Sequence, residues 1–281
     1  MFDRFSRSWS LLKASASVLR QDKELMIFPL ISTIAALIVV GSFIAPLFAF
    51  GWVDQLEEGT ASVVVYAWLF VFYLVQYFVI FFFNTALVGA AMIRLRGGDP
   101  TVADGFRIAF SKIGPILGYA AIAATVGLIL RAIEERLGIV GRWITGLLGA
   151  AWTVASFLVV PVLVAENVGP VDAVKKSVEL LKKTWGENLI GNVGVGLAFF
   201  LIYLLVGLVF AGGIAFAISL KNTAMMFTIG GLAVGVIVVL ALIQASLSGI
   251  YSAALYRYAA EGQGGAGFET QALSQAFRAK S

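Results

Sequence analysis

The sequence predicts an all-α, polytopic membrane helix bundle with six transmembrane helices. Hydrophobic residues make up 60% of the 281 residues and charged residues only 13%, which is outside the range of soluble domains. Six apolar stretches are long enough to cross a hydrocarbon core of about 30 Å as helices. They span residues 27–50, 62–93, 113–130, 143–165, 188–220 and 224–256. We expect residues 1–258 to form a single transmembrane domain and residues 259–281 to form a flexible cytoplasmic tail.

The second, fifth and sixth apolar stretches are longer than a perpendicular crossing requires. Such helices tilt, kink or project beyond the hydrocarbon core, and hydropathy does not distinguish these alternatives. Small residues four positions apart, as at Ser248 and Ser252, allow two helices to approach closely. The sequence therefore predicts tight helix packing, without naming the helices that pack together.

The distribution of positive charge predicts the orientation of the chain. Of the 20 Lys and Arg residues, 16 fall in the N-terminal segment, the second and fourth connections and the C-terminal tail. The positive-inside rule then places these segments, and both termini, in the cytoplasm. We expect a multi-pass protein of a prokaryotic cytoplasmic (inner) membrane. The mixed charges of the first 26 residues are not typical of a cleaved signal peptide.

Residues 166–189 contain a predicted basic amphipathic helix between the fourth and fifth spans. Its apolar stripe repeats at helical spacing and consists of Val171, Val174, Val178, Leu181 and Trp185. Pro170 suits the first helical position, and Asp172 in the first turn interacts favourably with the helix dipole. A helix of this kind is expected in the membrane interface beside anionic inner-leaflet lipids. The interface residues that we predict are Trp9, Lys175, Lys176, Lys182, Lys183 and Trp185.

Similar segments precede the first and third spans. Near the N-terminus, large apolar residues including Phe5 and Trp9 recur at helical spacing. Before the third span, Thr101 can cap a helix in which Asp104 lies three residues later, as in a capping box. The pattern favours three units, each an in-plane helix followed by a transmembrane hairpin. Chance similarity among amphipathic helices is the alternative explanation.

Composition excludes several kinds of chemistry. The chain has no Cys and no His, so it lacks cysteine nucleophiles, thiolate ligands, and the commonest general base and metal ligand. No Asp, Glu, Lys or Arg lies at mid-depth in the six apolar stretches, which argues against a proton-coupled pump. Phosphate-loop and dinucleotide signatures are also missing. We expect no catalytic residues, no cofactor, no metal, no nucleic-acid partner and no enzymatic activity.

A few polar residues remain inside the predicted spans. Gln76, Asn84 and Gln244 can form hydrogen bonds between helices or contact a polar substrate, and the first interpretation is favoured. At the cytoplasmic end of the fourth span, Glu166 is a candidate ion-pair partner for Arg94 or Arg96. None of these residues by itself identifies an activity.

The stretch from Pro161 to Gly186, PVLVAENVGPVDAVKKSVELLKKTWG, resembles a family of six-span bacterial and archaeal membrane proteins of unknown function. The opening residues from Phe5 to Leu12 look like the N-terminus of that family. More loosely, the stretch from Asp172 to Ser177 is similar to the membrane domain attached to some glycerophosphodiester phosphodiesterases. The resemblance implies a shared membrane architecture only, because the catalytic barrel of those enzymes is absent from this chain.

Two functions are compatible with these observations. The first is a non-enzymatic protein that organises or senses the bilayer, or scaffolds a protein partner, through its cationic interfacial helices. The second is a carrier or scramblase for a lipid or apolar small molecule, with Gln76 and Gln244 lining a groove between the long spans. Residue types alone do not decide between them.

Overall fold

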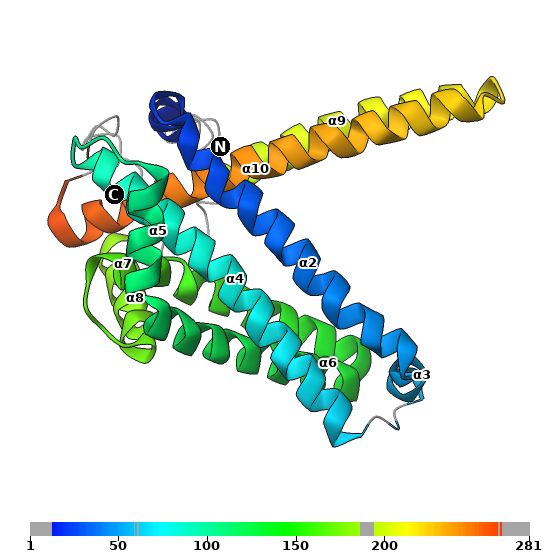
Figure 1. Ribbon diagram of the computed structural model, residues 1–281, viewed down its shortest axis with the longest axis horizontal. Helices are drawn as coiled ribbons and strands as arrows, with labels where there is room; N and C mark the ends of the chain where they lie inside the picture. The colour runs from blue at the N-terminus through cyan, green and yellow to red at the C-terminus, as the bar shows by residue number, and fades with distance from the viewer. Residues whose placement is uncertain (1–12, 59, 61, 186–193, 264, 266–281) are drawn as a thin grey trace.

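The computed structural model describes residues 13–58, 60, 62–185, 194–263 and 265 (Figure 1). Within these residues all regular structure is helical, and six helices are long and apolar enough to cross a membrane. This confirms the predicted all-α helix bundle. Residues 13–21 are helical and precede a short 3-10 helix, η1 (Lys23–Met26). The α-helices that follow are α2 (Ile27–Ala49), α3 (Trp52–Glu57), α4 (Val63–Leu95), α5 (Val102–Ser111), α6 (Ile113–Ser156), α7 (Val159–Ala165), α8 (Pro170–Trp185), α9 (Gly194–Ser219) and α10 (Thr223–Glu261).

The connection between the third and fourth spans differs from the prediction. We predicted that the third span ends at residue 130 and the fourth begins at residue 143, but both spans continue into the region between them and meet at a tight turn within α6. Gly138 makes the turn with φ of 56° and ψ of −126°, a conformation that glycine adopts without steric cost. The sixth span is also longer than predicted, because α10 continues to Glu261 and includes the first residues assigned to the tail.

Helix α4 is the central element, and α2, α5, α6, α7 and α10 all pack against it. Every residue from Thr85 to Met92 is buried, and most of these residues are small or β-branched. Gly89 in this segment faces Ile108 of α5 at a distance that leaves no room for a Cβ atom. Close packing through small residues is the usual way in which helices associate in a bilayer. The last third of α4 therefore forms the core.

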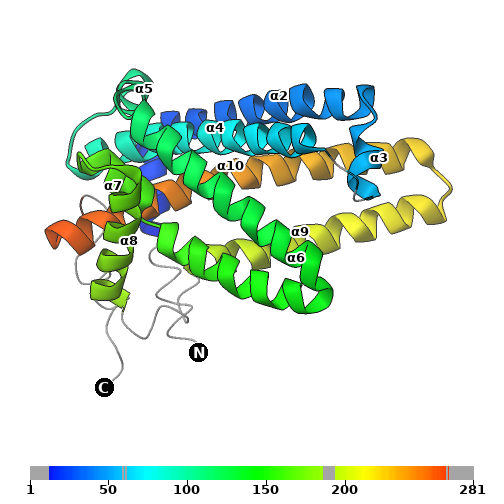
Figure 2. The same cartoon turned by 90° about the horizontal axis from the view of Figure 1, so that it is seen from below.

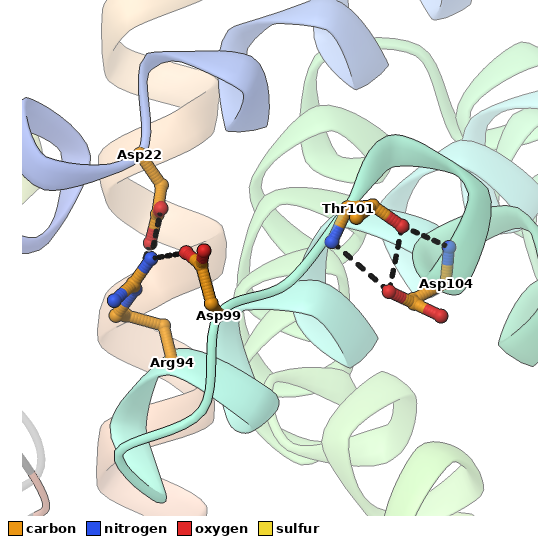
Figure 3. A network of polar contacts seen from close by, with 5 residues as sticks. All are labelled: Asp22, Arg94, Asp99, Thr101 and Asp104. Atoms are coloured by element: carbon orange, nitrogen blue, oxygen red, sulfur yellow. Dashed lines mark hydrogen bonds and ion pairs between the residues drawn. The ribbon is translucent and has the colours of Figure 1, made fainter.

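Helix α5 begins with the predicted capping box. The Thr101 hydroxyl accepts a hydrogen bond from the Asp104 backbone N–H at 3.2 Å, and the Asp104 carboxylate accepts one from the Thr101 N–H at 3.0 Å (Figure 3). The Thr101 hydroxyl also donates to this carboxylate, and these bonds hold the pKa of Asp104 below its ordinary value. The cap starts a helix whose Phe106 packs edge-on against Phe28 of α2, with ring centroids 5.5 Å apart.

Two regions stand out at opposite ends of the bundle. At one end, called the basic end here, α7 and α8 lie beside the C-terminal half of α10, and α5 lies at the same end against α4 (Figure 2). Toward the other end, α9 and the first half of α10 form a hairpin that extends away from the remaining helices (Figure 1). The 39 residues of α10 are about 58 Å long at 1.5 Å per residue, almost twice the hydrocarbon thickness. A continuous α10 must therefore tilt strongly or project beyond the hydrocarbon core.

The packing of α5 against α4 leads to a stability prediction. A Cβ atom at Gly105 would collide with the Phe28 ring and lie 2.8 Å from the backbone oxygen of Ala86, which cannot move aside. We expect Gly105→Ala to lower the free energy of unfolding by about 2 kcal/mol, as overpacked cores do. Denaturant unfolding of the purified chain in micelles measures this change.

Gly114→Ala is the matched control for this prediction, because a Cβ atom at Gly114 meets nothing within 4 Å. It should leave the free energy of unfolding within about 0.5 kcal/mol of the unmodified protein. Equal stability of the two variants would show that α5 does not pack closely on α4.

A candidate intramembrane binding site

A cavity of about 570 Å³ lies between α2, α4, α6, α7 and α10. Small-molecule sites commonly have volumes of 300 to 1,000 Å³. One of its lining residues, Asn84, precedes the end of α4 by 11 residues, about 16 Å along the helix axis, which places it near the middle of a 30 Å core. The cavity therefore lies at membrane depth, in the half of the bundle nearer to the basic end. Its polar lining residues are Ser32, Thr33, Asn84, Tyr119, Thr153, Ser156, Ser248 and Ser252.

Several hydroxyl groups of this lining donate their hydrogen bonds within their own helices. Thr33 donates to the carbonyl oxygen of Pro29 at 2.8 Å, and Thr153 donates to that of Gly149 at 2.9 Å. Ser156 and Ser252 likewise donate to backbone carbonyls of the preceding helical turn. A hydroxyl that donates in this way keeps its lone pairs available as acceptors. The cavity wall is therefore rich in hydrogen-bond acceptors.

The predicted intramembrane residues have different positions relative to the cavity. Asn84 lines it, with its side-chain oxygen close to Gly249 of α10. Gln244 is half-buried on α10 and is not part of the lining. Gln76 lies in α4 outside the lining as well, and its side-chain oxygen is buried without a hydrogen-bond partner among the described residues. Asn84 therefore belongs to the candidate site, whereas the groove lined by Gln76 and Gln244 is not this cavity and stays a prediction.

The cavity opens sideways, toward the space that lipid occupies around a membrane protein. Thr33 of α2, Ile80 of α4, Thr153 of α6 and Ala245 of α10 line the cavity and are also exposed. These residues lie within the membrane-spanning helices, so the opening is at the level of the hydrocarbon core. A molecule dissolved in the bilayer reaches the polar lining without first passing through water.

The fourth span is broken beside the cavity. Helix α6 ends at Ser156 and α7 begins at Val159, because Pro161 has no backbone N–H with which to continue the helical hydrogen bonding. The Leu158 N–H, which has lost its helical acceptor, donates instead to the Ser177 hydroxyl of α8 at 3.1 Å. Both Leu158 and Ser177 are fully buried. Helix α8 is thus attached directly to the break, and Phe157 at the break lines the cavity.

Ion pairs at the end of α4 connect the elements of the basic end. Arg94 forms hydrogen-bonded ion pairs with Asp22, which precedes η1, and with Asp99 in the loop before α5 (Figure 3). Arg96 forms an ion pair with Glu261 at the end of α10, with a distance of 3.0 Å. Basic residues at a helix C-terminus are favoured by the helix dipole. These pairs link the N-terminal segment and α10 to the last turn of α4.

Glu166 does not pair with Arg94 or Arg96, so that expectation is wrong. Its carboxylate accepts a hydrogen bond from the Tyr256 hydroxyl of α10 at 2.9 Å, and its backbone oxygen accepts one from Lys112 at 2.9 Å. The two arginines form ion pairs with other carboxylates, Arg94 with Asp22 and Arg96 with Glu261. Glu166 instead joins the end of α7 to α10.

The buried face of helix α8 overlaps the predicted stripe only in part. Leu181 of that stripe is buried and Val174 and Val178 are half-buried, but Val171 is 54% exposed, and the other buried residues are Ala173, Ser177 and Leu180. The small residues of the buried face allow α8 to approach α6 closely. At the start of α8 the approach is so close that a Cβ atom at Gly118 of α6 would lie 2.7 Å from the Pro170 ring. Packing against protein, and not burial in lipid alone, therefore determines which face of α8 is covered.

The four predicted lysines of α8 lie on its outer side, where Lys175 and Lys183 are well exposed. Lys175 pairs with Asp172, while Lys176 and Lys183 both pair with Glu179. The hydrogen bond from Lys183 and the charge of Lys176 hold the pKa of Glu179 below its ordinary value. Four lysines against two carboxylates leave this helix with a net positive charge. Trp9 and the side chain of Trp185, also predicted at the interface, are outside the described residues.

The hydroxyl-bearing residues of the cavity were not predicted. Ser and Thr are common in transmembrane helices, and those that line the cavity come from separate segments of the chain, so their grouping leaves no local pattern. The spacing of Ser248 and Ser252 was the only signal, and it predicted helix contact instead of a cavity.

These observations define a multi-pass helical membrane protein with a laterally open, largely apolar cavity whose polar lining residues are uncharged. The profile of a family of unknown function, DUF6159, matches residues 63–268, and the chain belongs to that family. No curated protein and no solved structure matches the chain. The predicted membership of a family of unknown function is thereby confirmed. The bacterial or archaeal origin and the looser likeness to phosphodiesterase membrane domains stay predictions.

The two partners of Arg94 allow a comparison of buried and exposed ion pairs. The Asp22 side chain is only 8% exposed, so Arg94→Gln leaves a nearly buried carboxylate without its cation. We expect a loss of about 2 kcal/mol in unfolding free energy, below the 3–5 kcal/mol of fully buried pairs because Arg94 is itself partly exposed. Denaturant titration in micelles measures the loss.

Asp99→Asn is the control, because the Asp99 side chain is 92% exposed and exposed ion pairs contribute less than about 1 kcal/mol. The prediction fails when Asp99→Asn destabilises the protein as much as Arg94→Gln does.

Proposed function

We propose that this protein binds an amphipathic lipid in the intramembrane cavity and moves it within or across the bilayer, as a carrier. The observation that supports the proposal best is a cavity of about 570 Å³, apolar with several polar residues in its lining, that opens sideways at membrane depth. A lipid fits this arrangement because its polar group occupies the cavity while its acyl chains stay in the hydrocarbon outside.

The polar lining itself argues for a ligand. Polar groups within the hydrocarbon region cost free energy unless they are satisfied, so proteins retain them where they bind something or join helices. Asn84 makes no hydrogen bond to another described residue, although its amide has two donors and an acceptor. A polar head group in the cavity would satisfy that amide.

The proposed carrier moves its ligand down a gradient. The cavity lining contains no Asp, Glu, Lys or Arg, so no residue there couples lipid movement to proton transfer. Ser156 and Val160 line the cavity on either side of the break between α6 and α7. Under this proposal the cavity wall bends at the break when the ligand moves. Under this proposal the protein has no enzymatic activity.

Reconstitution tests the carrier. Ala245 lies at the opening of the cavity on α10 and is exposed, so Ala245→Trp narrows the opening without replacing a buried residue. We expect purified protein in proteoliposomes to accelerate the transbilayer movement of a fluorescent lipid, and Ala245→Trp to slow this movement at least fivefold. Fluorescence quenching by a membrane-impermeant reductant measures the rate.

Two variants serve as controls in the same assay. Ala151→Trp adds the same bulk at an exposed position of α6 that is not part of the lining. Gln244→Leu removes a polar side chain of α10 that does not line the cavity either. Both should transport like the unmodified protein. Absence of accelerated movement, or an equal loss in Ala151→Trp, would overturn the carrier proposal.

A second candidate function is the sensing of anionic lipids by α8. The observation in its favour is that the net positive helix α8 is hydrogen-bonded through Ser177 to the break that borders the cavity. We propose that the basic end, with both termini, faces the cytoplasm of a prokaryotic cell, where each basic residue near an anionic leaflet contributes about 1 kcal/mol. The partner of this face is then the inner leaflet, and no protein partner is required.

Lipid composition tests the sensing function. Lys175 and Lys182 lie on the outer side of α8, so the double substitution of both by Gln lowers its charge without touching the buried face. We expect the melting temperature of the unmodified protein to rise by several degrees in nanodiscs that contain anionic lipid, compared with neutral nanodiscs. The double variant should lose about half of this rise.

Lys221→Gln is the control for this experiment, because Lys221 lies in the turn between α9 and α10 at the end farthest from α8 along both helices. It should keep the full rise in melting temperature. An identical response of all three proteins to anionic lipid would remove the sensing function and leave the carrier proposal unaffected.

A further inference from the structure

The cavity has polar residues in a largely apolar lining but carries no charge, and this restricts the ligand that it can bind. Its lining consists of Ser and Thr hydroxyls, one phenol, one primary amide and apolar side chains, without any acidic or basic residue. An anion at membrane depth requires a cation or several N–H donors, because desolvation of an unpaired charge is very costly. A phosphate-bearing head group would find neither in this lining. The ligand is therefore expected to be uncharged where it meets the wall.

The direction of the hydrogen bonds in the lining further restricts the chemical class of the ligand. The hydroxyl protons of Thr33, Thr153, Ser156 and Ser252 are donated to backbone carbonyls of the same helices. The remaining lone pairs of these oxygens can accept hydrogen bonds from a ligand, while Ser32, Asn84, Tyr119 and Ser248 of the same lining carry donors. A ligand that only accepts, such as an ester or a quinone, would meet the donors but leave these four acceptors without a partner. A ligand hydroxyl group donates to the wall and accepts from the Asn84 amide, so it satisfies both.

We propose that the cavity selects an uncharged lipid that carries a free hydroxyl group, a lipid alcohol such as a diacylglycerol. This inference depends on the proposed lipid-binding function and adds the chemical class of the ligand. The hydroxyl head lies near Asn84 at mid-depth, and the chains leave through the opening bordered by Thr33, Ile80 and Ala245. The volume of about 570 Å³ holds a head group and the first part of the chains, and the remainder stays in the surrounding bilayer.

Three lipids with the same dioleoyl chains test the inference on the purified full-length protein. Dioleoylglycerol has a free hydroxyl, its 3-acetate has an acceptor without a donor, and dioleoylphosphatidate has a charge. Native mass spectrometry of the protein titrated with each lipid in detergent measures the bound fraction. We expect dioleoylglycerol to bind at least tenfold more tightly than either of the other two lipids.

Variants connect this selectivity to the cavity. Asn84→Leu should lower the affinity for dioleoylglycerol about tenfold, because it removes the only primary amide from the lining. Gln244→Leu, outside the lining, should leave the affinity unchanged. Since the comparison of the three lipids uses the unmodified protein, it does not depend on the folding of any variant.

The outcomes separate this inference from the proposed function. Preference for dioleoylglycerol, lost in Asn84→Leu, supports the inference. Equal binding of all three lipids, or tighter binding of dioleoylphosphatidate, overturns the selectivity and leaves a general lipid-binding cavity. Absence of binding by all three lipids overturns the lipid-binding function itself.

Discussion

The close packing of the last third of α4 is the constraint on which the other helices depend. The segment from Thr85 to Met92 is buried on all sides, and α2, α5, α6, α7 and α10 pack around the helix. Its final turn is held by ion pairs of Arg94 and Arg96 and by a hydrogen bond from the buried Arg257 guanidinium of α10 to the Leu95 carbonyl. That bond satisfies one of the carbonyls that every helix end leaves without an internal partner.

A bilayer gives little hydrophobic driving force for helix association, so shape and polar contacts hold this bundle together. Gly89 and Gly105 let α4 and α5 approach each other, and Ser177 supplies an acceptor at the break in the fourth span. In the cavity, four lining hydroxyls donate to carbonyls of their own helices, and Asn84 has no hydrogen-bond partner among the described residues. An amide kept inside hydrocarbon without such a partner is the strongest argument that this region binds a ligand.

Prediction from the sequence was best where a single local pattern is sufficient. The capping box of Thr101 and Asp104 needs only four consecutive residues and appears as predicted, and the six apolar stretches correspond to the observed spans. Prediction failed where more than one face of a helix is suited to packing against the rest of the protein. On α8, apolar or small residues flank the lysines on both sides. The periodicity therefore did not show that Ala173 and Ser177 are buried against the bundle while Val171 is exposed.

The sequence by itself determined the class of protein, because hydropathy and charge act through composition and do not depend on how the helices pack. It also determined which chemistry is missing, since a chain without Cys and His cannot acquire those groups by folding. Only the tertiary structure decided which polar residues belong together. Asn84 and Ser248 are 164 positions apart, and they share a cavity because α4 and α10 pack side by side at the basic end. Long-range packing of this kind leaves no periodic trace in either helix.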